Sequence, residues 1–191
     1  MTPHDYVKWY NEKFKSSYSW STQKNDWELL IYLIKKYNIK SVFEIGTWKG
    51  DTSLLMWLHP NIERLKTIDI NKDMSIEYNH PNHSLEESRG DMIKNTNVEM
   101  EFVDSTQYKI KEGEQYDMIF IDGNHDLQHV TSDTLLALKF NPKVVVWHDY
   151  ERTNTDVVIY INDLKSKGTK INEAEGSCIV WSENENLINI T

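Results

Sequence analysis

The stretch from residue 41 to residue 53, SVFEIGTWKGDTS, constrains the fold of this chain more than any other part of the sequence. An apolar run leads into Glu44, and two spaced glycines, Gly46 and Gly50, permit a sharp turn and a close approach to a small molecule, which a Cβ would hinder. Residues 51–53 are polar and open a helix whose free backbone N–H groups face that turn. The stretch predicts a strand, a tight turn and a helix. Glycines at such a turn also serve only to pack strand against helix, so both interpretations remain open.

Predicted strands and helices alternate along the rest of the chain. The strands are predicted at 64–70, 98–103, 116–121, 143–147, 169–173 and 177–182, the last two joined by a turn at Glu175-Gly176. The helices are predicted at 51–58, at 84–95, from 127 to the Asn141-Pro142 stop, and at 155–167. Such alternation is typical of a parallel sheet. We therefore predict an α/β fold with a doubly wound, mainly parallel, seven-stranded Rossmann-like sheet, a terminal antiparallel strand pair and helices on both faces.

The N-terminal section is rich in aromatic residues. Helical spacing predicts helices at 4–17 and 25–37, the second with Asn25 as its N-cap. Trp9, Trp20 and Trp27 lie here, and they form a substrate cap, a subunit contact or ordinary core packing. The length predicts one domain, with a helical cap at 1–38, a Rossmann-like core at 39–182 and a tail at 183–191.

Composition narrows the class of partner. A net charge of -9 argues against a nucleic-acid or anionic-membrane surface and favours a small molecule. Cys178 is the one cysteine and lies in an apolar run, so we expect a buried thiol and no intramolecular disulfide. Without a leader-like or membrane-spanning stretch, we expect a cytoplasmic protein.

Polar residues end each of the first five predicted strands. They are Glu44, Asp69, Asp104, Asp122 and the pair His148-Asp149. In open α/β sheets the ligand lies beyond the carboxyl ends of the strands, so these side chains are predicted to converge on one crevice. Asp69 follows the glycine turn by about twenty residues, the separation of a carboxylate that accepts hydrogen bonds from ribose hydroxyls.

Three motifs together resemble the class I S-adenosylmethionine-dependent methyltransferases, and more narrowly the small-molecule O-methyltransferase branch, methyltransferase family 24. They are Glu44-Ile45-Gly46 through Gly50 to Ser53, Ile121-Asp122-Gly123-Asn124-His125, and His148-Asp149-Tyr150. The resemblance covers roughly residues 40 to 182 and is more specific than any one motif.

The resemblance implies how S-adenosylmethionine is held. The loop from Glu44 to Gly50 would hold the methionine moiety, Asp69 the ribose, and Asp104 with Ser105 the adenine. The implied cofactor-binding residues are Glu44, Gly46, Thr47, Gly50, Ser53, Asp69, Asp104, Ser105 and Asp122. Carboxylates suit the ammonium group and the hydroxyls, because both are hydrogen-bond donors.

The resemblance also implies a catalytic group of Asp122, His125 and Asp149. Asp122 and Asp149 would hold a divalent ion such as Mg²⁺, and His125 would act as general base. Two structural alternatives stay open, in which His125 is a capping or hydrogen-bonding residue and Asp149 satisfies backbone N–H groups. His148 is interpreted as an orienting partner.

Three positions depart from the family pattern. Trp48 stands where the wider class often has a glycine, Asn141-Pro142-Lys143 replaces a glycine pair, and Tyr150 replaces an Asn or an acid. Trp48 also disfavours a nicotinamide-dependent dehydrogenase, whose fingerprint requires glycine there.

The predicted activity is methyl transfer to a hydroxyl of a small acceptor, a sugar or secondary metabolite, with metal assistance. The alternative is a catalytically inactive cofactor-binding or regulatory partner module. A homo-oligomer formed through the aromatic N-terminal segment is also expected.

Overall fold

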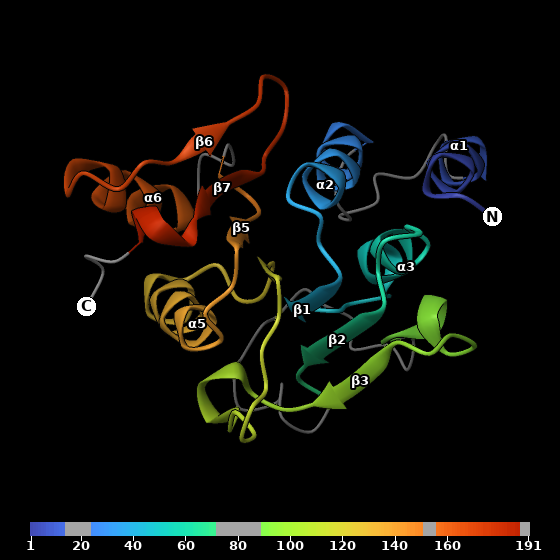
Figure 1. The fold of residues 1–191 in the computed structure, drawn as a ribbon, viewed down its shortest axis with the longest axis horizontal. Helices are drawn as coiled ribbons and strands as arrows, with labels where there is room; N and C mark the ends of the chain where they lie inside the picture. The colour runs from blue at the N-terminus through green and yellow to red at the C-terminus, as the bar shows by residue number, and fades with distance from the viewer. Residues whose placement is uncertain (14–23, 72–88, 151–155, 188–191) are drawn as a thin grey trace.

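The computed structural model describes residues 1–13, 24–71, 89–150 and 156–187. Trp20, the predicted helix end at residue 17 and the first part of the predicted helix 84–95 lie outside these residues. One seven-stranded sheet runs through the described part, in the order β3-β2-β1-β4-β5-β7-β6 (Figure 1). The strands are β1 (Ser41–Ile45), β2 (Arg64–Asp69), β3 (Glu99–Phe102), β4 (Met118–Ile121), β5 (Val144–Trp147), β6 (Asn172–Glu173) and β7 (Val180–Glu183). Strands β1 to β5 are parallel, while β7 is antiparallel to both β5 and β6, so the predicted fold class is confirmed.

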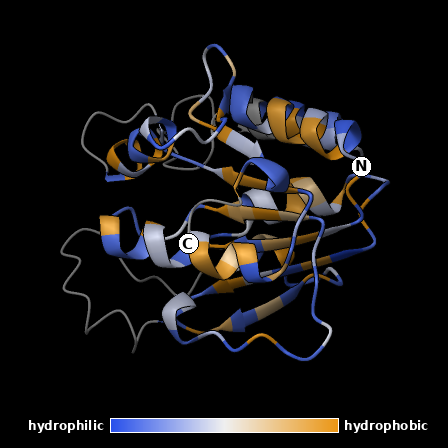
Figure 2. Cartoon of the chain, turned by 60° about the vertical axis from the view of Figure 1, so that its left-hand side comes forward, coloured by the Kyte–Doolittle hydropathy of each residue, from blue (hydrophilic) through white to orange (hydrophobic). Residues whose placement is uncertain are grey.

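Helices cover both faces of the sheet. They are α1 (Pro3–Lys13), α2 (Lys24–Lys36), α3 (Asp51–Trp57), α5 (Leu127–Lys139) and α6 (Asp156–Ser166). Successive strand residues point to opposite faces, so Val144 and Val146 pack with α1 to α3, while Val145 and Trp147 pack with α5 and α6. Because both faces are covered, β4 and β5 are built of apolar residues. The hydropathy colours in Figure 2 show largely orange strands in the middle of the molecule.

Two aromatic residues of the N-terminal section, Tyr6 and Trp27, belong to the core. Tyr6 and Trp27 are buried, and the Tyr6 ring stacks on both Trp9 and Trp27. The Tyr6 hydroxyl donates to Asp51 Oδ1 over 3.1 Å and so joins α1 to the start of α3. These contacts fit the interpretation of Tyr6 and Trp27 as core residues.

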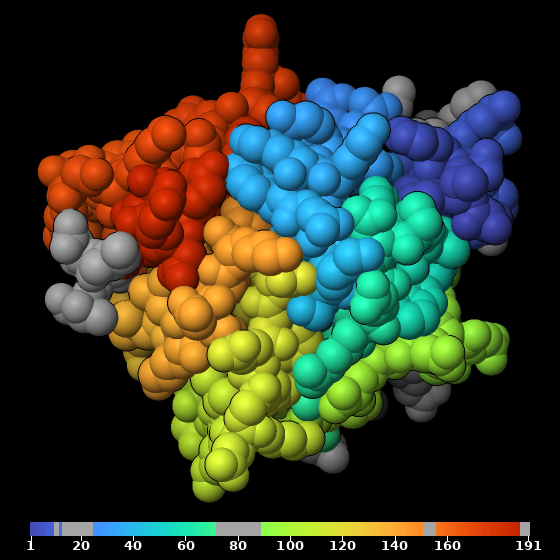
Figure 3. Space-filling model, viewed as in Figure 1, coloured from blue at the N-terminus to red at the C-terminus, as the bar shows by residue number. Residues whose placement is uncertain are grey.

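Helix α2 lies beside the C-terminal strands, and in Figure 3 its blue surface borders the red end of the chain. The Tyr37 hydroxyl donates to Glu183 Oε1 over 2.5 Å and accepts from Trp181 Nε1 over 3.2 Å. The first and last parts of the described chain are therefore held together by hydrogen bonds. None of its helices has the length and apolar character needed to cross a membrane.

Two local predictions were wrong. Helix α2 begins at Lys24, so Asn25 lies within its first turn and is not the N-cap; its side-chain amide donates instead to the Gly176 carbonyl over 2.9 Å. The predicted helix 84–95 does not continue to 95, because Gly90 has a φ of 72° and only a short 3₁₀ turn, Asp91–Ile93, follows. The positive φ favours glycine at residue 90, and a Cβ there would lie 2.3 Å from the Met100 sulfur and displace that side chain.

Candidate active site

The site lies where the order of the sheet reverses. Strand β1 pairs with β2 on one side and β4 on the other, so the connections leave the sheet in opposite directions at this point. Ligands of open α/β sheets bind beyond the carboxyl ends of strands at such a crossover. Asp69 ends β2, Asp122 follows β4, and His148 with Asp149 follows β5.

The glycine turn after β1 is fixed by protein contacts. Gly46 has a φ of 96°, and a Cβ there would lie 2.0 Å from the Asp122 carbonyl oxygen. Gly50 has a φ of 85°, and a Cβ added there would lie 3.2 Å from the Ile93 side chain. Packing thus accounts for both glycines. Trp48 adopts a φ of 45°, so an aromatic residue takes a conformation that favours glycine.

Asp69 holds this turn in place. Its Oδ2 accepts from the backbone N–H groups of Thr47 and Trp48, over 3.1 and 2.7 Å. Its Oδ1 accepts from the Arg89 guanidinium over 2.5 Å, an ion pair that the sequence motifs did not predict. A ribose at this carboxylate would have to share it with Arg89 or displace Arg89.

Glu44 and Ser53 lie beneath the turn. Both are buried, and the Ser53 hydroxyl donates to Glu44 Oε2. Burial raises the pKa of Glu44 to about 8, and the bond from Ser53 only partly opposes it. Thr47 is also buried, and its hydroxyl lies 2.6 Å from that of Thr67. These side chains support the turn from below.

The segment after β3 carries the predicted adenine-binding residues. Asp104 caps the short 3₁₀ turn Ser105–Gln107 by accepting from the Thr106 N–H over 2.8 Å. Asp133 of α5, which the sequence analysis missed, lies near Ser105 of this segment and near Gly123, where a Cβ would lie 3.3 Å from its Oδ2. Within the described residues no hydrogen-bond donor satisfies either Asp133 carboxylate oxygen. Burial raises the pKa of Asp133 to about 6, although the nearby Ser105 hydroxyl lowers it in part.

This buried carboxylate predicts a pH-dependent stability. The pKa of Asp133 is higher in the folded than in the unfolded chain, so ionisation of this carboxyl lowers the free energy of unfolding. The loss of stability is absent below about pH 4 and complete above about pH 6. A rise from 3.8 to about 6 corresponds to about 3 kcal/mol at most. We expect Asp133→Asn to gain stability relative to the parent chain as pH rises from 4 to 7, measured by urea unfolding at each pH. An equal difference at both pH values would contradict this account.

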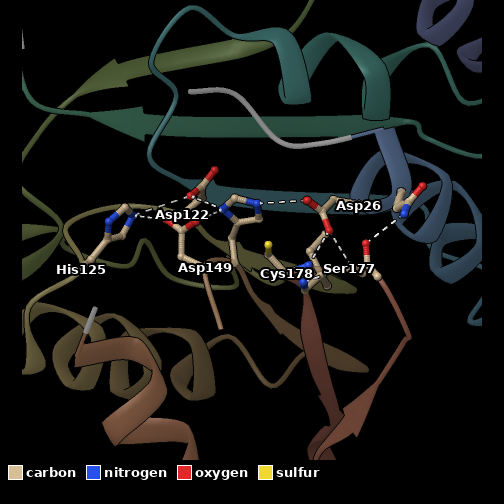
Figure 4. Close-up of polar contacts among 10 residues, drawn as sticks. Asp26, Asp122, His125, Asp149, Ser177 and Cys178 are labelled. Carbon is tan, nitrogen blue, oxygen red and sulfur yellow. Dashed lines mark hydrogen bonds and ion pairs between the residues drawn. The ribbon is translucent and has the colours of Figure 1, made fainter. Parts of the chain in front are cut away.

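Four side chains meet beyond β4 and β5, drawn in Figure 4. His125 Nε2 lies 2.8 Å from Asp149 Oδ2 and 3.9 Å from Asp122 Oδ1. His148 Nδ1 lies 3.0 Å from Asp122 Oδ1 and 3.2 Å from Asp149 Oδ1. The three predicted catalytic residues are therefore brought together, with His148 among them.

The electrostatics of this group couple the acids to the histidines. Burial alone would lower the pKa of His125, but hydrogen bonds to Asp122 and Asp149 raise it to about 9. Burial would likewise lower the pKa of His148, but the Asp122 charge and its hydrogen bonds raise it well above the usual range. Burial alone would raise the pKa values of Asp122 and Asp149. Hydrogen bonds and charges from His125 and His148 have the larger effect, so both pKa values are lowered.

Asp26 of α2 is a second residue that the sequence analysis missed. It is fully buried, and its Oδ2 lies 3.4 Å from His148 Nε2. Its Oδ1 accepts from the Ser177 hydroxyl over 2.5 Å and from the Cys178 N–H over 2.8 Å. Figure 4 shows the resulting row of polar contacts, from His125 through the strand-end acids to the C-terminal segment.

The donor atoms around Asp122 suit a cation. One atom from each of Asp122, His148 and Asp149 lies within 4.8 Å of the other two. Asp149 has a φ of 63°, a left-handed conformation that Asp tolerates better than most residues. Tyr150 is directed elsewhere, since its hydroxyl donates to Asn162 Oδ1 over 3.0 Å and accepts from Lys165.

Comparisons with known proteins identify the family of this chain. The sequence model of a family described as "Methyltransferase domain", methyltransferase family 24, matches residues 43–150. None of the curated protein sequences matches the chain significantly.

Three solved structures share the fold. One is the O-methyltransferase of Bacillus cereus in complex with S-adenosylhomocysteine (TM-score 0.60, 16% identity, covering 95% of this chain and 90% of that one). Another is TomG, an O-methyltransferase of Streptomyces achromogenes involved in tomaymycin synthesis, in complex with S-adenosylmethionine (0.61, 16%, 94% and 87%). A third is the S-adenosylhomocysteine-bound methyltransferase PaMTH1 of Podospora anserina (0.60, 11%, 94% and 86%).

Proposed function

Because the chain belongs to methyltransferase family 24, we propose that it transfers a methyl group from S-adenosylmethionine to a hydroxyl oxygen of a small acceptor, a sugar or secondary metabolite. The observation that carries the proposal is the convergence of Asp122, His125 and Asp149 beside the glycine turn at the sheet crossover. A base, two carboxylates and a cofactor loop then border the same crevice.

The donor set fits this cofactor. Asp69 offers carboxylate oxygens where ribose hydroxyls would need acceptors, and the unsatisfied Asp133 lies by Ser105, where the adenine is expected. Both acids supply acceptors for groups that donate hydrogen bonds. Glu44, Gly46, Thr47, Gly50 and Ser53 contribute the shape of the turn.

The Asp69→Asn variant tests the cofactor site. We expect it to bind S-adenosylmethionine more weakly by about 1 to 3 kcal/mol, the range for losing a hydrogen bond to a charged group, as measured by isothermal titration. Asp91→Asn is the matched control, because Asp91 is exposed and forms an ion pair with the neighbouring Lys94, away from Asp69. Thermal unfolding checks that the variant is folded. Unchanged affinity in folded Asp69→Asn would remove Asp69 from the site.

In the proposed mechanism His125 removes the proton of the acceptor hydroxyl. Methyl transfer is an in-line displacement at a sulfonium, so the enzyme's task is to align the acceptor oxygen and deprotonate it. Asp149 orients the His125 ring through the 2.8 Å contact to Nε2, and Asp122 lies on the same side. A divalent ion such as Mg²⁺, held by Asp122 and Asp149, would lower the pKa of the acceptor hydroxyl and orient it.

The alternative proposal is a cofactor-binding module without catalysis. The Arg89–Asp69 ion pair favours this alternative, because Arg89 already occupies the carboxylate that would accept hydrogen bonds from the ribose. Isothermal titration with S-adenosylmethionine, combined with a mass-spectrometric scan of hydroxylated acceptors, separates the two. Cofactor binding without any methylated product across sugars and phenols would favour the inactive module.

The proposal includes a cytoplasmic location and a homo-oligomer formed through the aromatic N-terminal segment. Light scattering on size-fractionated protein tests the assembly, and the mass of one chain at every concentration would contradict it.

A further inference from the structure

We propose that His148 is a third metal ligand, oriented by Asp26, and that the centre therefore prefers an imidazole-accepting ion such as Co²⁺ or Zn²⁺ over Mg²⁺. This inference rests on the proposed metal assistance at Asp122 and Asp149 and deepens it. It adds a nitrogen ligand and a supporting carboxylate that the sequence motifs did not assign to the metal.

The first step is the position of the His148 ring. Its Nδ1 lies 3.0 Å from Asp122 Oδ1 and 3.2 Å from Asp149 Oδ1, so it faces both carboxylates that would hold the ion. The three side chains offer ligand atoms within 4.8 Å of one another, from the ends of two neighbouring strands. His148 is buried, while the Asp122 side chain is partly exposed. His148 Nδ1 thus lies on the buried side of the proposed metal site, and the exposed side at Asp122 is left for the methyl acceptor.

The second step is the far nitrogen of the same ring. His148 Nε2 lies 3.4 Å from Asp26 Oδ2, and the other Asp26 oxygen is fixed by Ser177 and Cys178. The Asp26 carboxylate at Nε2 favours a proton there, so Nδ1, which faces Asp122 and Asp149, is the nitrogen that would give up its proton to bind a metal. Metal-bound histidines commonly donate their second N–H to a carboxylate in this way, which fixes the tautomer and the ring orientation.

The third step is the choice of ion. Mg²⁺ prefers oxygen ligands and usually retains several waters, whereas imidazole suits Zn²⁺ and related transition ions. Transition-metal ions bind most sites with nitrogen and oxygen ligands more tightly than Mg²⁺ does, so a preference of the parent chain for Co²⁺ over Mg²⁺ does not by itself show that His148 is a ligand. A fall in that preference when the His148 nitrogen is removed does show it.

The test is metal titration of the full chain by calorimetry, with Co²⁺ and Mg²⁺ alone. In His148→Asn an amide oxygen takes the place of Nδ1, and we expect the ratio of Co²⁺ to Mg²⁺ affinity to fall at least ~10-fold. In His148→Gln the amide lies nearer the Nε2 position, so contact with Asp26 is retained and affinity for both ions should fall. Asp26→Asn should weaken Co²⁺ binding by ~10-fold or more, the usual effect of a group that orients a metal ligand. His129→Gln is the control, because His129 of α5 pairs with Asp126, the N-cap of that helix, and the variant should bind both ions as the parent does.

Proton NMR of the Co²⁺-loaded parent chain gives a second readout, which does not depend on substituting the buried residues His148 or Asp26. A coordinated His148 retains its Nε2 proton, so a hyperfine-shifted signal should appear in H₂O, vanish in D₂O and persist in His125→Asn. Absence of that signal, or an unchanged Co²⁺ to Mg²⁺ ratio in folded His148→Asn, would overturn the ligand role. If Asp122→Asn still abolishes metal binding in that case, the proposed metal assistance stands and only this inference fails. If the parent chain binds neither ion, both fail.

Discussion

The Asp122→Asn variant is expected to lose methyl transfer by at least about a thousandfold at fixed metal concentration. A bound ion contributes several kcal/mol to transition-state stabilisation, and each 1.36 kcal/mol is about tenfold in rate. The same substitution also removes the negative charge beside His148 and His125. The measurement is the initial rate of S-adenosylhomocysteine release with saturating cofactor and acceptor, over a series of metal concentrations. Asp149→Asn should have a similar effect, because it removes the negative charge that contacts both His125 and His148.

The controls for this prediction separate metal binding from hydrogen bonding. Asp163→Asn changes an exposed carboxylate that pairs with Lys167 and should keep the parent rate. Chelation with EDTA should abolish turnover in the parent chain, and added metal should restore it. Full activity in EDTA together with impaired Asp122→Asn and Asp149→Asn would remove the metal role and leave the acids as orienting groups.

The second large effect is expected at His125. His125→Ala should lower the rate at saturating metal by roughly a hundredfold to ten-thousandfold, the usual contribution of a general base, with cofactor affinity nearly intact. Only the neutral imidazole accepts a proton, and the acids raise the pKa of His125 to about 9. The parent rate should therefore rise with pH towards that value, with the rise beginning lower when a cation neutralises the acids. In His125→Ala this rise should be lost.

The pH profile of kcat is the measurement that distinguishes a base from a hydrogen-bonding residue. A structural His125 would change the rate by the same factor at every pH. Full activity of His125→Ala would mean that another group deprotonates the acceptor.

The layered fold was predictable because its determinants are local. The strands β4 and β5 are apolar without interruption, and each is followed at once by the polar residues that end it. The resemblance to class I methyltransferases of family 24 is confirmed by the match over residues 43–150. The departure at Trp48 also has a physical account, since its backbone takes the conformation that a glycine would take and Asp69 holds it there.

The missed residues share a different property, which is that no local sequence pattern links them to the groups that they contact. Asp26 meets His148 from α2, 122 positions away, and no spacing rule links a helix start to a strand end that far along the chain. Asp133 lies on the buried side of α5 among residues that simply continue a helical pattern. Arg89 reaches Asp69 from a connection whose turn at Gly90 was predicted as helix. Tertiary placement decides all three.

Transfer of an isotopically labelled methyl group from S-adenosylmethionine tests most directly whether this centre carries out methyl transfer. The parent chain, Asp122→Asn and His125→Ala would each be incubated with labelled cofactor, metal and a panel of sugars and phenols, and the products analysed by mass spectrometry. We predict a labelled methyl ether from the parent chain, and its near-complete loss in both variants while each still binds S-adenosylmethionine. Equal labelling of an acceptor hydroxyl by the parent and both variants would contradict the assignment of Asp122 and His125 to the reaction.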